Sequence, residues 1–499
     1  FLCNGLVNPD RSPHPAMAEV KYVHQNVGFE ATDIASGKFK ITNRFYFTNL
    51  KKYQIHYNVV ANNKIIRGGK VSLDIEPQAS KEFTVPVNGL KAQPGTEYFV
   101  NFSVTTVEPE PLIPIGYEIA YDQFQLPVQA EKETYKVSGP ALSTSTQGDE
   151  LIVSSSKVNF VFNKKSGLVT SYKVDGTEYF KDGFGIQPNF WRAPNDNDYG
   201  NGAPKRLQVW KESSKNFHVT DVSMTNENKV VSLNATYLLA AGNLYIVTYK
   251  IYPSGVVNVN AKFTSTDMQA AETEVSEATR MATFTPGSDA ARKAASKLEV
   301  PRIGVRFRLP AQMNNVQYFG RGPEENYTDR NHGTVVGVYK TTADKMYFNY
   351  VRPQENGHRT DTRWIALSPD KGKGLVIVAD SLVGFNALRN SIEDFDSEEA
   401  LPHPYQWSNF TPEEVANHNE KAARNVLRRM HHVNDITPRD FVEVCVDMKQ
   451  QGVGGYDSWG SRPEPIYQIP ANREYNWGFT LVPVRSPGQA NEAAKYDYR

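Results

Sequence analysis

The sequence predicts an all-β protein of two β-sandwiches, a small one followed by a much larger one, with few short helices. Apolar residues occupy every second position in 38–42, 257–263 and 442–448, which is typical of strands with one buried and one solvated face. Turn sequences recur between such stretches: Asn62-Asn63, Gly68-Gly69, Asp175-Gly176, Ala241-Gly242-Asn243 and Pro253-Ser254-Gly255. Many short strands separated by turns favour sandwiches.

Breaks in this pattern divide the chain. We expect an entry segment at 1–15, the first sandwich at 16–128, a polar linker at 129–147, the second sandwich at 148–486 and a polar tail at 487–499 that frays. The chain begins at Phe1 without an initiator methionine or the signature of a signal peptide, so we expect a piece of a larger protein.

Two helices are predicted within the second sandwich. Thr411 is a suitable N-cap, Pro412 fits the first helical position, and acidic residues follow in the first turn of a helix that runs to about Met430. A weaker helical pattern covers 289–297 after Ser288.

Composition excludes several function classes. Lys+Arg and Asp+Glu both count 55, so no net charge favours nucleic acid or an anionic membrane. No apolar run approaches the roughly 18 residues of a membrane span. We therefore expect a soluble protein, cytoplasmic or periplasmic, with no nucleic-acid or membrane partner. The two cysteines, Cys3 and Cys445, are predicted to be buried free thiols.

Five segments are dense in polar and aromatic residues: 1–15, 188–200, 318–330, 350–364 and 452–460. The Asn/Asp alternation of 188–200 suits a cation or sugar hydroxyls, or else a loop that satisfies its own backbone. Glu324 and Glu325 are neighbours, and on a strand they would point to opposite faces. A structural ion pair with Arg321 or Arg330 is therefore favoured over paired acid/base catalysis.

The other two segments have open interpretations. The Arg- and amide-rich segment 350–364 suits either buried hydrogen bonding or contacts to sugar hydroxyls, and His358 is not expected to bind a metal because no His or Cys partner lies at ligand spacing. Trp459 lies among glycines, which suits either an indole that stacks on a sugar or one that fills the end of a sandwich. Neither interpretation is preferred on the sequence alone.

Together these segments resemble the C-terminal half of the large β-galactosidases of glycoside hydrolase family 2, over nearly the whole chain. The similar motifs are 4–7, 10–15, Pro77-Gln78, 119–124, Arg192-Ala193-Pro194 with 196–198, 301–304, 320–323 with 325–327, and 458–460. The resemblance implies an immunoglobulin-like fourth domain followed by a large mutarotase-like β-sandwich.

The resemblance also implies that the catalytic residues are elsewhere. That family cleaves terminal β-linked galactose with retention, using two glutamates about 5 Å apart on a (β/α)₈ barrel. Both would precede Phe1, as would the magnesium ligands, so we expect no catalytic residue here and no hydrolysis of lactose by this chain alone. Its expected partners are a β-galactoside, the missing barrel and N-terminal domains, and further copies in a homo-oligomer.

Four features carry over from the resemblance. Phe1, through its carbonyl, and Asn4, through its side chain, resemble sodium ligands, and Asn4 also resembles a galactose contact. Trp459 resembles a stacking residue for the aglycone. The loop Gly200-Asn201-Gly202-Ala203-Pro204 resembles, in shorter form, a mobile loop that closes over the site. One carbonyl and one amide are too few ligands for a hard cation, so we expect sodium only in the intact enzyme and no cofactor in this chain.

Other readings remain open. Tyr456 stands where the resembled family often has an acidic residue, which leaves the contacts near Trp459 undefined. The alternatives are the small subunit of a two-chain β-galactosidase and a carbohydrate-binding or structural module. An independent mutarotase would need a converging His and carboxylate, for which His332 with Asp329 is the nearest pair.

Overall fold

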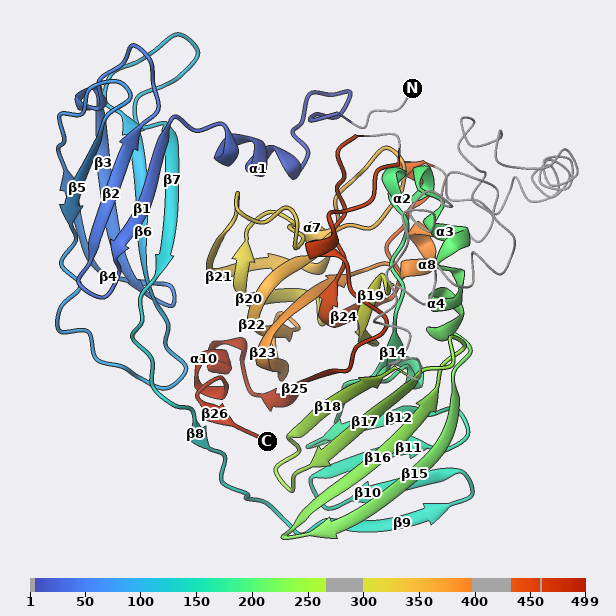
Figure 1. Cartoon of the computed structure of the whole chain (residues 1–499). Coiled ribbons are helices and arrows are strands. Elements are labelled where there is room, and N and C mark those ends of the chain that lie inside the picture. Colours follow the sequence, from blue (N-terminus) through green and yellow to red (C-terminus); the bar gives the residue numbers. More distant parts are fainter. Residues whose placement is uncertain (1–4, 266–298, 397–431, 458–459) are drawn as a thin grey trace, which may run out of the picture.

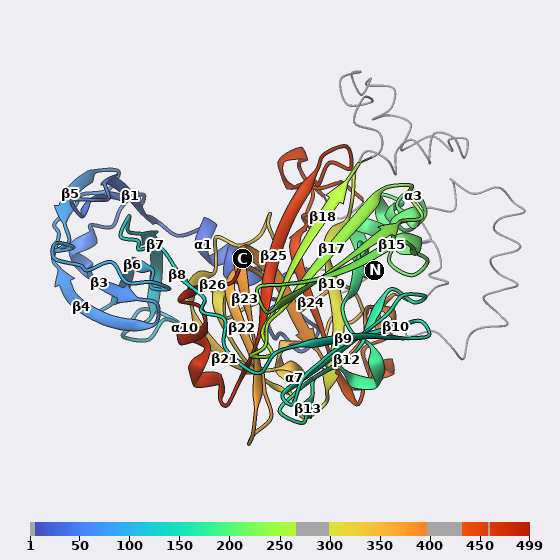
Figure 2. The same ribbon diagram turned by 90° about the horizontal axis from the view of Figure 1, so that it is seen from below.

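The computed structural model describes residues 5–265, 299–396, 432–457 and 460–499. The helices predicted at 411–430 and 289–297 lie outside these residues. Five sheets, with only short helices among the described residues, confirm the all-β prediction (Figures 1 and 2). The helix that opens the described chain, α1 (Ala16–Val23), leads into the small sandwich.

The small sandwich has seven strands in two sheets. One sheet has the order β1 (Val27–Asp33), β2 (Lys38–Asn43), β5 (Ser80–Thr84), and the other β4 (Lys64–Val71), β3 (Tyr53–Ala61), β6 (Tyr98–Thr106), β7 (Glu118–Gln125). This arrangement is immunoglobulin-like. Phe102 occupies its centre, with ring centroids 4.6 Å from Phe29 and 4.9 Å from Phe39.

The large unit is built on one extended sheet. Its main path is β14 (Gln187–Asn189), β19 (Arg302–Pro310), β24 (Phe441–Gln450), β23 (Gly374–Leu388), β25 (Tyr475–Val484), β18 (Val257–Thr264), β17 (Leu244–Ile251), β16 (Val230–Leu238), β15 (His218–Glu227). Through β23 it also joins β22 (Arg359–Ser368), β20 (Asn315–Gly322) and β21 (Val335–Thr342). The three predicted alternating stretches thus fall in β2, β18 and β24.

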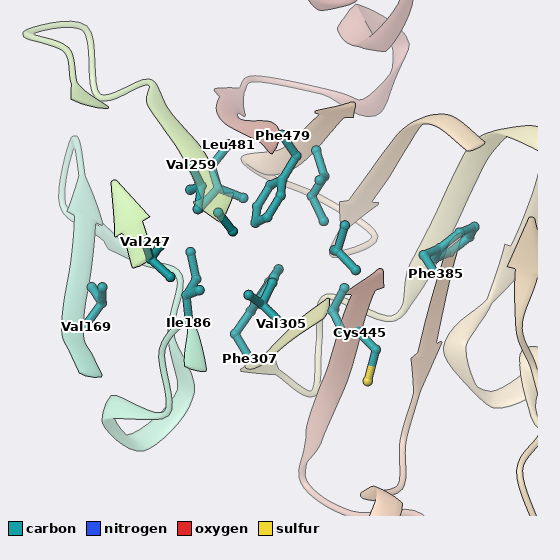
Figure 3. Close-up of a cluster of buried hydrophobic side chains, with 14 of the residues drawn as sticks. Val169, Ile186, Val247, Val259, Val305, Phe307, Phe385, Cys445, Phe479 and Leu481 are labelled. Carbon is teal, nitrogen blue, oxygen red and sulfur yellow. The ribbon is translucent and has the colours of Figure 1, made fainter. Parts of the chain in front are cut away.

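A second sheet of the large unit has the order β13 (Thr177–Glu178), β12 (Leu168–Val174), β11 (Val158–Asn163), β10 (Glu150–Ser154), β9 (Ser143–Gln147). It faces β15–β18 across one apolar core, which includes Val169, Val247 and Val259 and continues to Phe307 and Phe479 (Figure 3). Cys445 lies in this core as a buried free thiol, as predicted; Cys3 lies outside the described residues.

Short helices fill the connections. In the large unit they are α2 (Asp196–Gly200), α3 (Ala203–Arg206), α4 (Gln208–Ser213), α7 (Ala343–Met346), α8 (Ile392–Phe395) and α10 (Ala490–Ala493). Three-residue 3-10 turns are η1 (Leu50–Lys52), η2 (Lys181–Gly183), η6 (Val433–Asp435), η7 (Pro465–Tyr467) and η8 (Pro487–Gln489).

The two units share an interface. Glu97, before β6, forms a two-point ion pair with Arg363 on β22, at 2.8 and 2.7 Å. The side-chain amide of Gln123 on β7 donates to the Val336 carbonyl at 2.8 Å and accepts from the Val336 amide at 2.7 Å. Phe99 of the small sandwich joins an apolar cluster of the large unit. The contacts fix the small sandwich against β21 and β22.

The expectation that the tail frays is wrong. Residues after 486 form η8 and α10, and β26 (Tyr496–Asp497) pairs in parallel with β8 (Glu133–Thr134) of the linker. Tyr498 is buried, and its ring centroid lies 4.7 Å from that of Tyr135. The tail is polar overall, but a few of its apolar side chains are buried and pack against the linker. The other end of the predicted linker is also structured, as β9 begins at Ser143.

Candidate functional site

The polar segments predicted from the sequence converge on one end of the large unit, beside α2 and the first described residues (Figure 1). From the segment 5–15, His14 places its ring edge-on against Tyr350, with centroids 5.4 Å apart. The Tyr350 hydroxyl donates to Glu325, and Arg330 donates to the same carboxylate at 2.9 Å. Three of the five segments therefore meet around Glu325.

Glu325 has a structural role. It is buried and also accepts from the Gly357 amide at 2.7 Å. The ion pair with Arg330 confirms the structural bridge preferred over catalysis. Glu324 and Glu325 follow the end of β20 at Gly322, so the expectation of opposite strand faces does not apply to them.

The 188–200 segment satisfies its own polar groups. Arg192 is buried and its guanidinium donates to both carboxylate oxygens of Asp198, at 3.0 and 3.1 Å. Asn195 caps α2: its side chain accepts from the Asp198 amide, and Asp198 in turn accepts from the Asn195 amide. This capping box is the self-satisfied loop that the sequence left as one of two alternatives.

The glycine-rich loop 452–455 is held by two of the other segments, 188–200 and 318–330. Arg192 donates to the carbonyls of Gln451 at 2.8 Å and Gly452 at 3.0 Å. Asn195 donates to the Val453 carbonyl at 3.0 Å. The Asp329 carboxylate accepts from the amides of Val453 at 3.1 Å and Gly454 at 2.7 Å. The loop is thus fixed through its backbone.

The predicted loop Gly200–Pro204 lies beside the end of this glycine-rich segment. Gly200 ends α2, and Ala203-Pro204 begins α3 after Gly202, whose φ of 71° is in the left-handed region. Asn201 accepts from the Ala203 amide at 3.1 Å. A Cβ on Gly460 would lie 2.3 Å from the Gly200 carbonyl carbon, so only glycine allows this approach. The backbones of the two loops are therefore in contact. The closing motion of Gly200–Pro204 that the resemblance implies stays a prediction.

Three predicted site residues lie outside the described residues: Phe1, Asn4 and Trp459. The described residues nearest to them in sequence are Gly5, Asp457 and Gly460. Within the described ranges, no group of three or more His, Cys, Asp or Glu side chains is placed to hold a metal ion, and no helix is long and apolar enough to cross a membrane.

A buried charged cluster lies close to the loop and was not predicted. Arg302 and Asp447 are fully buried on the paired strands β19 and β24, with Nε 2.9 Å from Oδ1. Glu355 lies 4.0 Å from the Arg302 guanidinium, and His358 lies 3.8 Å from Asp447. Burial outweighs the attraction of Arg302 and raises the pKa of Asp447 to about 7. Burial also raises the pKa of Glu355.

His358 stays neutral in this cluster. Burial, then repulsion from Arg302, lowers its pKa well below the ordinary value, and its ring stacks on Tyr327 with centroids 5.4 Å apart. Its partner Asp447 is far away in sequence, so no local spacing could have predicted the pair. A cavity of about 10 Å³ adjoins Glu355 and Cys445. That is space for about one water molecule and far too little for a sugar.

The pair considered for mutarotation does not converge. His332 is exposed and lies 3.4 Å from Glu19 of α1, with its ring stacked on Tyr22. Asp329 is committed to the amides of the glycine-rich loop. His332 and Asp329 therefore serve different contacts.

Two family models and several curated proteins match this chain. A family model described as β-galactosidase small chain matches residues 154–481, and one described as β-galactosidase, domain 4 matches residues 39–127. The β-galactosidase of Priestia megaterium is 30% identical over 487 residues, which cover 97% of this chain and 41% of that protein. The β-galactosidase of Vibrio cholerae is 24% identical over 492 residues, covering 98% and 42%. The chain thus spans about two fifths of the length of these curated relatives.

Solved structures similar to this chain include a galactose 1-epimerase from Lactobacillus acidophilus, with a TM-score of 0.34, 8% identity, and coverage of 70% of this chain and 100% of that one. A heparan sulfate lyase from Pedobacter heparinus has a TM-score of 0.25 and 7% identity, and the match covers 72% of this chain and 37% of that one.

The family model described as β-galactosidase small chain spans well over half of the sequence. The protein therefore belongs to the β-galactosidase small chain family.

Proposed function

We propose that the chain is the C-terminal part of a retaining β-galactosidase of glycoside hydrolase family 2, which hydrolyses terminal non-reducing β-D-galactose residues. In this proposal the chain forms part of the active-site wall, and the two catalytic glutamates lie on a barrel that precedes Phe1. Nearly the whole of this chain is similar to part of β-galactosidases that are more than twice as long, and this supports the division of roles.

One observation carries the proposal: four polar segments and residues 5–15 meet at a single end of the large unit. His14 packs on Phe348 and Tyr350 there. A barrel that precedes residue 1 would join the molecule at this place. It would bring its open face to the loops around Gly200 and Gly454.

The buried glutamates at this end are unsuited to the reaction. Retaining hydrolysis needs an acid/base and a nucleophile that both reach the anomeric carbon, about 5 Å apart. Glu325 is buried and engaged by Arg330 and Tyr350, and Glu355 is buried beside Arg302. Glu325 also accepts from the Gly357 amide, so its contacts hold segment 350–364 in place.

Sodium and magnesium belong to the proposed intact enzyme. The Phe1 carbonyl and the Asn4 side chain would supply two oxygen ligands for sodium, which needs more. The remaining ligands would come from the barrel, as would all those of magnesium. A bound sodium would orient the sugar. Asn4 and Trp459 are the proposed contacts for the galactoside, and a homo-oligomer is the proposed assembly.

The test is complementation. The chain by itself is expected to leave nitrophenyl β-galactoside intact, and mixing it with a separately expressed catalytic half should restore hydrolysis. Hydrolysis by the chain alone would overturn the proposal. Galactose binding by the isolated chain in calorimetry, lost in Trp459→Ala and without any complementation, would favour a carbohydrate-binding module.

A second candidate is the small subunit of a two-chain β-galactosidase. The family description, small chain, favours it. Mass spectrometry of the purified native enzyme distinguishes the two: one polypeptide that contains this chain supports the single-chain enzyme, and a separate chain of about this length supports the two-chain form.

A further inference from the structure

Two loops of the small sandwich expose many apolar side chains. Residues 44–49 connect β2 to η1, and residues 107–117 connect β6 to β7. Six of the sixteen exposed large apolar side chains of the described chain lie on these two loops: Tyr46, Phe47, Val107, Leu112, Ile115 and Tyr117. Single exposed apolar residues are normal, but a group of them on adjoining loops marks an interaction surface.

The two loops adjoin each other. Lys52, at the end of η1, forms an ion pair with Glu110 of the second loop at 2.9 Å. Phe45 of the first loop stacks on Tyr53 with ring centroids 5.8 Å apart, and Tyr53 pairs across the sheet with Thr106. Thr106 directly precedes the second loop. The six apolar side chains therefore form one patch, the end patch, at the end of the sandwich that α1 joins (Figure 1).

Hydrogen bonds hold both loops in a defined conformation. The Gln78 side chain donates to the carbonyls of Arg44 and Phe45, at 2.9 and 3.0 Å. The Thr106 hydroxyl donates to the Pro114 carbonyl at 2.7 Å. Because these contacts fix the backbone in advance, little conformational freedom is lost when a partner covers the apolar side chains.

Leu112 occupies a position that suits the fold of its own chain poorly. Its φ of 66° is in the left-handed region, where glycine is favoured. Its side chain is fully exposed and so gains nothing from the core of the sandwich. A contact with a second molecule explains why a leucine stands there.

The end patch is separate from the contact between the two units. Glu97, which pairs with the large unit, precedes β6, whereas Val107 follows it. The nine residues of β6 put about 30 Å between these two ends. The side chains of the end patch are exposed with every described residue in place, so the patch is open to a partner.

The end patch is complementary to itself. The loop 44–49 carries aromatic rings and leads to Lys51, which is exposed. The loop 107–117 carries mainly aliphatic side chains and Glu108, which is exposed as well. A two-fold axis between two copies places each loop against the other loop of the second copy. Rings then meet aliphatic side chains, and a lysine meets a glutamate, twice over.

We propose that the end patch is a two-fold interface between two copies of this protein. The aromatic side chains of 44–49 in one copy pack on the aliphatic side chains of 107–117 in the other, and Lys51 faces Glu108 at the rim. The inference rests on the homo-oligomer of the proposed function and names its surface. An apolar centre rich in aromatic residues with charges at the rim is the usual composition of a specific interface.

The experiment is sedimentation velocity of the full chain over a range of concentrations, in which the wild type should dimerise. Phe47→Ser and Leu112→Ser should each raise the dissociation constant of the dimer about 30-fold, as is typical of a central interface residue. The matched control is Ile65→Ser. Ile65 is 59% exposed on β4 of the same sandwich, outside the end patch, and its replacement should leave the dimer unchanged.

A charge exchange tests the proposed register. Lys51→Glu and Glu108→Lys should each weaken the dimer roughly 5-fold, because each places like charges opposite one another in both halves of the interface. The double variant restores opposite charges in both halves and should recover the wild-type dissociation constant. A contact with any other surface would not be restored by this exchange.

Three results would contradict the inference. The first is a wild type that stays monomeric up to about 100 µM, both alone and assembled with its catalytic part. The second is a dimer that Phe47→Ser and Leu112→Ser leave intact. The third is loss of binding to the catalytic part in these variants while the dimer persists, which would assign the end patch to the preceding part of the polypeptide. Sedimentation does not depend on hydrolysis, so a failure of the proposed catalytic role is seen separately.

Discussion

In residues 16–128, all of which the structure describes, no Asp, Glu, Lys or Arg is fully buried, whereas the large unit buries Arg192, Arg302, Glu355 and Asp447. The small sandwich is held by apolar packing around Phe102. The polar end of the large unit is held by ions and hydrogen bonds to loop backbone. Apolar packing needs only shape and volume, but a buried ion is stable only with its partner present. The two regions should therefore respond differently to substitution.

Tryptophan fluorescence can separate the two regions. All six tryptophans lie between residues 191 and 477, so the signal reports on the large unit. Hydrogen exchange of β3 and β6 reports on the small sandwich. Together these measurements show which unit a substitution destabilises.

The largest effect is expected for Arg302→Met. It leaves Asp447 and Glu355 buried without their cation, which should lower the free energy of unfolding of the large unit by roughly 3–5 kcal/mol. Denaturant titration followed by tryptophan fluorescence measures this loss. Lys40→Met removes an exposed pair with Glu30 and is the control, with little change expected. A loss as small as the control's would show that the buried pair contributes nothing.

In the small sandwich, Phe102→Ala should cost about 3–4 kcal/mol because it leaves a cavity between Phe29 and Phe39. Hydrogen-exchange protection of β3 and β6 should fall, while the tryptophan transition changes little. Phe102→Leu keeps most of the volume and should cost less. A matching shift of the tryptophan transition would show that the two units unfold together.

Tyr498→Ala tests the ordered tail. It removes a buried ring that packs on Tyr135, with an expected cost of about 2–3 kcal/mol and increased proteolysis of the linker near Thr134. Tyr498→Phe loses only the hydrogen bond to the Ala493 carbonyl and should cost about 1 kcal/mol. Wild-type resistance to proteolysis in the alanine variant would contradict a role for the tail in holding the linker.

The interface between the units should be weaker. Arg363→Ala breaks a two-point, partly buried pair with Glu97, with an expected coupling energy of about 1 kcal/mol in a double-mutant cycle with Glu97→Ala. Arg363→Lys keeps the charge but not the second hydrogen bond and should recover only part of it. A coupling energy of zero between Arg363 and Glu97 would show that the apolar cluster and the hydrogen bonds of Gln123 hold the interface together.

The final prediction is a dependence of stability on pH. Because burial raises the pKa of Asp447 to about 7, the folded state binds a proton more tightly than the unfolded state, and stability should fall as pH rises from about 4 to about 7. His358 acts in the opposite direction: its lowered pKa makes stability fall as pH drops below about 6.5. Asp447→Asn should remove the first slope, whatever its overall stability. If the unfolding free energy of Asp447→Asn still falls with pH as in the wild type, another group causes the dependence.

The sequence by itself determined the strands and most of the turns. Alternating apolar residues in β2, β18 and β24 follow from the two-residue period of a strand, which is local. The prediction of a turn at Gly68-Gly69 is wrong: the pair lies inside β4, where a Cβ on Gly69 would lie 2.6 Å from the Tyr57 ring. The glycine there makes room for a cross-strand neighbour, and a local reading cannot distinguish that from a turn.

Tertiary structure alone decided the buried ion cluster, the clamp on the glycine-rich loop and the place of the tail. Arg302 meets Asp447 because β19 pairs with β24, and Asp329 meets Gly454 because two distant loops end at the same edge. The sequence marked 318–330, 452–460 and the tail as polar, but it did not mark Arg302 or Asp447. Which carboxylate binds which partner depends on sheet order and on desolvation, and both are properties of the folded chain.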